Sequence, residues 1–141
     1  MALAPQFEES IKEVEVTFGF DQFECDPKDI TAALGIAPDE VRRRGQQIPG
    51  RGGRVHTVLC NSWSITSRSE SKDVNDHCRE VLKRLAGAVG RLNPQWGVPW
   101  FSVLYRATHL CGGNGPFFEA DVVQGIGALG AELWQDIYSL E

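Results

Sequence analysis

Strict alternation of apolar and polar residues along Lys12–Phe20 is the feature that most limits what this chain can fold into. Valine or phenylalanine occupies every even position from 14 to 20, and glutamate or threonine occupies positions 13, 15 and 17. Successive side chains of a strand point to opposite faces, so the pattern predicts a strand with one buried and one polar face. Such strands favour an α+β fold, because a fully parallel α/β sheet is buried on both faces.

Three later segments also have the pattern of extended chain. Trp100–Thr108 and Leu133–Leu140 each predict one strand. Residues 55–67 fit either one bent strand or two short strands, because Asn61-Ser62 suits a bulge as well as a turn.

Helices are predicted between these strands. Pro27–Leu34 follows Asp26, an N-cap acid, and ends before Gly35, which can adopt the left-handed cap conformation. A long helix is predicted over Asp73–Leu92, where apolar residues recur at spacings of three and four and form a buried stripe. The stripe consists of Val74, Cys78, Val81, Leu82, Leu85, Val89 and Leu92. A third, short helix is predicted over residues 118–129.

The order of these elements predicts one α+β domain for the 141 residues. That order is β-α-β, a long helix and β-α-β again, and the helix of each half closes on a Leu-Gly pair, at Leu34-Gly35 and Leu129-Gly130. We therefore predict a pseudo-duplicated fold with a single sheet of four to five strands and with helices packed mainly on one face. A fully parallel α/β layout is the alternative. Residues 1–11 are expected to be a loosely ordered tail, and residues 42–54 an Arg/Gly-rich loop.

Composition points to a cytoplasmic protein without a membrane partner. No run approaches the roughly 18 apolar residues of a membrane span. The first residues turn acidic at Glu8 and Glu9, with no basic and apolar leader before them. The four cysteines are spread without a C-x-x-C pair, a pattern typical of reduced thiols that serve as small hydrophobic residues.

Several short motifs occur in series over nearly the whole chain. They are Ile30-Thr31, Leu34-Gly35-Ile36 with Pro38, Gly45, Trp63, and Leu129-Gly130-Ala131 leading into Asp136-Ile137-Tyr138. Together they resemble a bacterial family known only as domain of unknown function 4279. The resemblance implies a small stand-alone α+β domain. It implies no activity, substrate or catalytic residue, so no functional residue is transferred from the family.

Charge is strongly segregated along the chain, although the net charge is only −5. Residues 1–40 contain ten acidic residues and two lysines, whereas residues 41–69 contain six arginines and no acid. A glycine-rich loop with this many guanidinium groups can follow a phosphate backbone or contact a carboxylate-rich surface. The alternative is a solvated loop held by ion pairs to Asp39 and Glu40. The candidate binding residues of this loop are Arg42, Arg43, Arg44, Arg51 and Arg54.

An acidic protein is favoured over nucleic acid as the partner of this loop. The isoelectric point is near 5.2, and no aromatic residue between Phe23 and Trp63 is available to stack on bases. Trp96 and Trp100 are further binding candidates, because tryptophan is frequent at interface hot spots. Core packing is the alternative role for both.

The sequence predicts no catalytic residue, cofactor site or metal site. Cys111 with His109 or His56 offers a nucleophile and a base, and the glycines after Cys111 offer backbone amides, but no third group is placed to orient the histidine. The histidines and cysteines lack the closed spacing of zinc ligands. The glycine-rich segment Gly112–Gly115 matches no phosphate-binding motif.

We therefore predict a non-catalytic protein-binding module whose partner is another protein or a second copy of the chain. Neutralisation of a basic toxin is one version of this function, since a small acidic domain suits a basic partner. The first alternative is a small-molecule-binding protein or enzyme that uses a site near Cys111 and His109. The second alternative is a domain that binds an anionic ligand or nucleic acid through the loop from Arg42 to Arg54.

Overall fold

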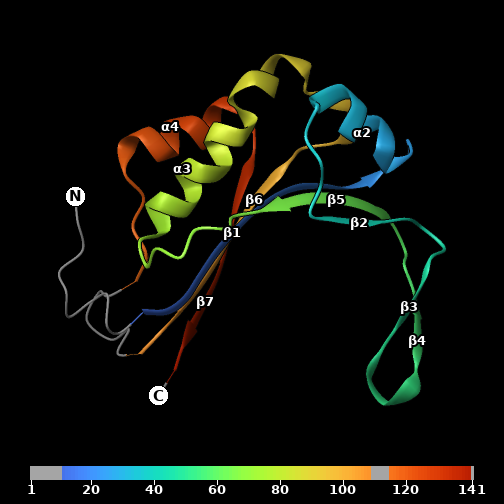
Figure 1. The fold of residues 1–141 in the computed structure, drawn as a ribbon, viewed down its shortest axis with the longest axis horizontal. Coiled ribbons are helices and arrows are strands. Elements are labelled where there is room, and N and C mark those ends of the chain that lie inside the picture. The colour runs from blue at the N-terminus through green and yellow to red at the C-terminus, as the bar shows by residue number, and fades with distance from the viewer. Residues whose placement is uncertain (1–10, 109–114, 141) are drawn as a thin grey trace.

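A computed structural model describes residues 11–108 and 115–140 of the chain (Figure 1). Five of its strands form one sheet: β1 (Ile11–Phe23), β2 (Glu40–Arg42), β5 (Asn61–Thr66), β6 (Trp100–Ala107) and β7 (Glu132–Ser139). Their order across the sheet is β2-β5-β1-β6-β7. β1 therefore lies at the centre of the sheet, and β2 and β7 form its two edges.

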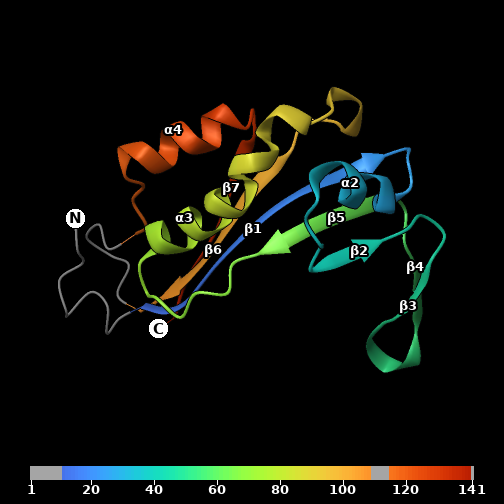
Figure 2. The ribbon, with the colours of Figure 1, turned by 45° about the horizontal axis from the view of Figure 1, so that its top comes forward.

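The three α-helices of the described residues lie on one side of this sheet, as Figures 1 and 2 show. They are α2 (Pro27–Leu34), α3 (Val74–Leu85) and α4 (Ala120–Ala128). α2 contacts β5, α3 packs against β1, and α4 lies beside α3 and β7. β1 is antiparallel to β5 and β6, and β2 is antiparallel to β5, whereas β6 and β7 are parallel. The predicted α+β class is confirmed, and the sheet is mixed rather than fully parallel.

The predicted duplication of two β-α-β halves is not confirmed. The helix α2 joins two strands, β1 and β2, that have β5 between them. The helix α4 instead joins β6 and β7, which are direct neighbours. The similar Leu-Gly helix ends therefore belong to two connections of different geometry.

The alternation along β1 places its side chains as predicted. Val16, Phe18 and Phe20 are at most 1% exposed and face the helices, while Glu15 on the other face is exposed. The largest fully buried side chains of the core are Trp63, Phe18, Phe20, Phe101, Ile30 and Leu34. The hydrophobic effect of burying this side of the sheet is the main stabilisation of the fold.

The face of the sheet that the helices leave uncovered is here called the open face. Trp100 of β6 and Trp134 of β7 stack on it, with ring centroids 5.3 Å apart. The Trp100 indole also covers Gly19 of β1, where an added Cβ would come within 2.6 Å of the ring. Glycine at position 19 is therefore required for the ring to lie flat on the sheet.

The predicted start and end of α2 are confirmed in detail. The Asp26 carboxylate accepts a hydrogen bond of 2.9 Å from the N–H of Lys28, as an N-cap does. Gly35 ends the helix with a φ of 69°, the left-handed conformation that glycine adopts without strain. Asp73 caps α3 in the same way, accepting from the N–H of Asn75 at 2.9 Å.

The long helix is shorter than predicted. α3 ends at Leu85, and Ala86–Arg91 forms a 3₁₀ segment in place of the rest of the predicted helix. Gly87 and Gly90 fall in this segment, and glycine costs about 1 kcal/mol relative to alanine inside an α-helix. Val89, expected in the apolar stripe, is consequently 39% exposed. No helix among the described residues is long and apolar enough to cross a membrane.

Residues 55–67 form two strands, and these belong to different sheets. β4 (Val55–Thr57) pairs antiparallel with β3 (Gln47–Pro49), and the two make a separate hairpin. Much of the segment expected as an Arg/Gly-rich loop is thus regular structure. Residues 43–60, which contain this hairpin, project from the end of the sheet between β2 and β5 (Figure 1). We call this projection the arm.

Candidate functional site

Backbone hydrogen bonds hold the arm together from its base to its tip. At the base, the N–H of Gly45 donates to the carbonyl of Val58 at 2.9 Å, and the N–H of Val58 donates to the carbonyl of Gln46 at 2.8 Å. Near the tip, the N–H of Gly50 donates to the carbonyl of Arg54 at 2.6 Å. The arm is therefore a hydrogen-bonded antiparallel hairpin, although its two strands are only three residues long.

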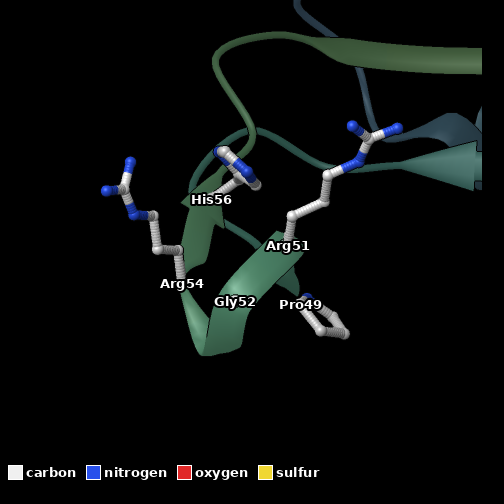
Figure 3. A pocket seen from close by; sticks show the side chains of 6 residues that line it. Pro49, Arg51, Gly52, Arg54 and His56 are labelled. Atoms are coloured by element: carbon white, nitrogen blue, oxygen red, sulfur yellow. The ribbon is translucent and has the colours of Figure 1, made fainter.

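The turn at the tip depends on glycine. Gly52 and Gly53 have φ angles of 67° and 75°, in the left-handed region that other residues rarely adopt. Gly50 lies under the His56 imidazole, and a Cβ at this position would overlap the ring. The packing of His56 on the Gly50 backbone places the ring in the middle of the tip (Figure 3).

The five candidate arginines fall into two groups, of which the first lies at the base of the arm. Arg42 pairs with Glu40 at 2.9 Å, Arg43 with Asp26 at 3.1 Å, and Arg44 with Glu24 at 3.1 Å. These pairs are solvent-exposed, and exposed pairs contribute about 0–1 kcal/mol each. Their positive charge is balanced locally by acidic residues, most of them from the N-terminal part of the chain.

The second group, Arg51 and Arg54, lies at the tip of the arm. Neither forms an ion pair with an acidic group among residues 11–108 and 115–140. Figure 3 shows their guanidinium groups extending to opposite sides of the His56 imidazole. Together with Pro49 and Gly52, these three residues line an open hollow at the tip. The tip is thus a cationic surface without internal neutralisation in the described structure.

Two exposed aliphatic side chains lie in the arm, one near its tip and one near its base. Val55 of β4 is 60% exposed, and Leu59, where the arm returns to the sheet, is 85% exposed. Val55 follows Arg54 directly, whereas Leu59 lies with Arg44 at the base of the arm. An exposed apolar residue beside arginines that have no acidic partner among the described residues is more typical of a protein interface than of a solvated loop. The alternation expected for residues 55–67 contains both, but it gives no sign that they are exposed.

The structure places the two candidate tryptophans in different surroundings. Trp96 is 6% exposed and packs edge-on against Phe20, with ring centroids 5.3 Å apart, so it belongs to the core. Trp100 is half-buried on the open face, in the stack with Trp134. Neither lies in the arm, so the candidate residues do not form one site.

The possible catalytic pair Cys111 and His109 lies outside the described residues, as do positions 112–114 of the segment Gly112–Gly115. His56, the other candidate base, is at the tip of the arm. Cys25, Cys60 and Cys78 are free thiols. Burial raises the pKa of the Cys78 thiol to about 12, so this thiol stays protonated and unreactive at neutral pH. No three histidine, cysteine or acidic residues gather as a metal site within the described part of the chain.

Two buried polar residues of α3 were not anticipated as partners of distant loops. The His77 ring lies 2.7 Å from the Ser67 hydroxyl on one side and 2.7 Å from the Ser71 carbonyl on the other. The Asn75 side chain donates to the carbonyl of Phe117 and accepts from the N–H of Glu119. His77 lies on the apolar face of α3, one residue before the buried Cys78. This place in the helical pattern is the sequence signal that could have predicted the burial of His77.

The carboxylate of Asp26 links the cap of α2 to the base of the arm, and it makes stability depend on pH. The Lys28 N–H that it accepts from, and then the Arg43 guanidinium, hold the pKa of Asp26 below its ordinary value. A carboxylate whose pKa falls on folding adds stability above its unfolded pKa of about 4, and this stability is lost as pH drops through the folded pKa.

We therefore expect the melting temperature to fall on acidification below about pH 4. Asp26→Asn keeps a capping oxygen but loses the titrating charge, so it should make this fall less steep. Thermal melts of both proteins between about pH 5 and pH 2 provide the measurement. Parallel curves for the two proteins would contradict the role given to Asp26.

A family model described as "Domain of unknown function (DUF4279)" matches residues 12–140, a range that includes the complete arm and all but the first residue of the sheet. The chain belongs to the DUF4279 family. The predicted resemblance is thereby confirmed over nearly the whole chain. No curated protein matches the chain, and no solved structure matches it. The DUF4279 description names no activity.

Proposed function

We propose that this DUF4279 domain is a non-catalytic protein-binding module that docks to an acidic protein surface through the tip of its arm. The observation that carries the proposal is the pair Arg51 and Arg54, which project on a hairpin and have no acidic partner among the described residues. Guanidinium groups in this state are available for bidentate hydrogen bonds to carboxylates.

A protein is a better partner for this tip than a nucleic acid. Val55, directly after Arg54, provides an exposed aliphatic contact, which an apolar patch on a protein can bury. The arm has no phenylalanine, tyrosine or tryptophan on which a base could stack, and its His56 imidazole packs on the Gly50 backbone. The tip offers two arginines that have no ion pair within residues 11–108 and 115–140, and the net charge is −5, so the counterion release that drives nucleic-acid binding would be small.

The narrower parts of this proposal concern the setting of the protein. We propose a bacterial, cytoplasmic protein, in keeping with the free thiols of Cys25, Cys60 and Cys78, which suit a reducing compartment. Neutralisation of a basic toxin would use the acidic surface instead of the arm, and the net charge of −5 is its only support.

The test compares two double variants that remove equal charge from the two ends of the arm. Arg51→Gln with Arg54→Gln removes the tip charges, and Arg42→Gln with Arg43→Gln removes charges that are already neutralised at the base. We expect both variants to keep the wild-type melting temperature within a few degrees, because exposed residues contribute little to stability. Only the tip variant should lose its partner, with binding about tenfold or more weaker.

The partner is captured from a lysate of the source cells at moderate salt and then titrated in purified form against each variant. Equal binding by the two variants would refute docking through the tip. A short DNA duplex serves as a second probe. Tight DNA binding that is lost in the tip variant would replace the proposal with the nucleic-acid alternative.

A further inference from the structure

The outer edge of β7 is unlike the other edge of the sheet. β7 has eight residues, all of them exposed, and no other strand of the described structure pairs with its outer side. Its exposed large hydrophobic residues are Leu133, Trp134, Ile137 and Tyr138, with exposures between 37% and 52%. The opposite edge strand, β2, has only three residues.

Proteins usually protect a long edge strand with lysine, proline or a bulge, because its free N–H and C=O groups attract another strand. β7 contains neither lysine nor proline, and its pairing with β6 continues without a register shift. The edge is therefore suited to receive a strand. We propose that β7 pairs antiparallel with β7 of a second copy of this chain, about a two-fold axis at Gln135.

Hydrogen-bond direction limits the possible registers. The N–H of Glu132 donates to the carbonyl of Pro99, and the N–H of Leu140 donates to the carbonyl of Ala107, so even-numbered residues of β7 point their N–H groups toward β6. In a parallel ladder the intervening residues point theirs away. The outward N–H groups in the middle of the strand belong to Leu133, Gln135 and Ile137. Antiparallel pairing must set outward residues opposite outward residues, so the two-fold axis has to pass through a residue rather than between two.

Charge then selects among the three central registers. An axis at Trp134 would place Glu132 opposite Asp136 of the second copy, and an axis at Asp136 would place that residue opposite itself. Like charges directly opposite one another destabilise a sheet. An axis at Gln135 avoids both arrangements.

The register centred on Gln135 also makes favourable side-chain pairs. It sets Leu133 opposite Ile137 of the second copy on the helix side of the sheet, twice in the dimer. On the open face it sets Trp134 opposite Asp136 and Glu132 opposite Tyr138. About six backbone hydrogen bonds would form, two for each bonded pair. This dimer uses no residue of the arm, so it is independent of the docking function proposed above.

One unfavourable interaction remains and can be used as a diagnostic. Asp136 lies diagonally across from Glu132 and Asp136 of the second copy, at roughly 7–8 Å in a regular antiparallel pair. Charges at this separation repel, and salt weakens the repulsion because the Debye length is about 8–10 Å at 0.1–0.15 M. We therefore expect association to become tighter at higher salt, and Asp136→Asn to tighten it at low salt.

The experiment measures mass by sedimentation over a concentration series for the wild type and three variants. Gln135→Pro removes an outward N–H that β6 does not use, so the monomer fold tolerates it while the central pair is lost. Ile137→Lys changes a 45% exposed side chain and places a charge opposite Leu133. Val55→Lys, at a 60% exposed site on the arm, is the matched control. We expect dimers for the wild type and the control and monomers for the two β7 variants, with similar melting curves when dilute.

Hydrogen exchange supplies a readout within the same strand. The amides of Leu133, Gln135 and Ile137 should be protected only at concentrations that give dimer, whereas those of Trp134 and Asp136, bonded to β6, should be protected throughout. A chain that is monomeric at every concentration would refute the proposal. So would dimers that survive both β7 variants, or outward amides that are protected in the monomer.

Discussion

Replacing Trp63 with alanine is expected to destabilise the fold by about 3–5 kcal/mol, the usual cost of truncating a buried large aromatic residue. Trp63 is 0% exposed in β5, and its Nε1–H donates to the Thr31 hydroxyl of α2 at 2.9 Å. The substitution would therefore open a cavity and also remove the hydrogen bond that fixes α2 on the sheet. Natural domains have only about 5–15 kcal/mol of stability, so much of the total would be lost.

Urea unfolding of the variant measures this loss. One control variant changes the same site, and a second changes another tryptophan. Trp63→Phe retains most of the ring volume and should cost less than the alanine variant. Trp134→Ala, in dilute protein, removes a side chain that is 44% exposed and should cost about 0.5–1.5 kcal/mol through its stack on Trp100. A loss at Trp63 no larger than that at Trp134 would show that α2 and β5 do not share a core.

The second large effect is expected at Leu85, near the end of α3. Leu85 is 1% exposed, and Leu85→Ala should lower the free energy of unfolding by about 2–5 kcal/mol. Lys83→Ala, two residues earlier on the exposed face of the helix, should change it by less than about 0.5 kcal/mol. Equal effects of the two substitutions, measured by urea unfolding, would mean that the other face of the helix is buried.

Local signals in the sequence predicted elements whose boundaries depend on neighbouring residues. α2 has the predicted limits because Asp26, Pro27 and Gly35 each act within one turn of the helix end. The stripe of α3 predicted the burial of Val81 and Leu85, but not the change to a 3₁₀ segment after Leu85, which depends on how Gly87 and Gly90 meet the surrounding fold.

Local sequence patterns could not predict the hairpin of the arm or the ion pairs of its arginines. β3 and β4 have three residues each, too few for alternation to distinguish them from a loop. Arg43 and Asp26 are 17 residues apart, so their contact exists only once β1, α2 and β5 have assembled. The ion pair of Arg42 with Glu40 was among the pairs considered, whereas Asp39 pairs with Arg68 and Arg84. The separation of tip from base arginines therefore emerges only from the structure.

The sequence also could not predict that β7 is an exposed edge strand. Its sequence reads as an ordinary strand, because alternation reports which residues share a face and says nothing about whether a strand is central or at an edge. Strand order comes from long-range pairing, which no local pattern contains.

The unequal edges of the sheet bear on how far an assembly could grow. Pairing through β7 is isologous, so it uses the long edge of both copies at once, and the three-residue β2 strands become the two edges of the joined sheet. Such an assembly is closed at two subunits and cannot extend into a fibre. Each outer end of the ten-stranded sheet then carries one arm, and the nine strand spacings between the ends correspond to roughly 40 Å. A partner with two acidic sites at that separation would be bound bivalently, with an avidity that neither arm has alone.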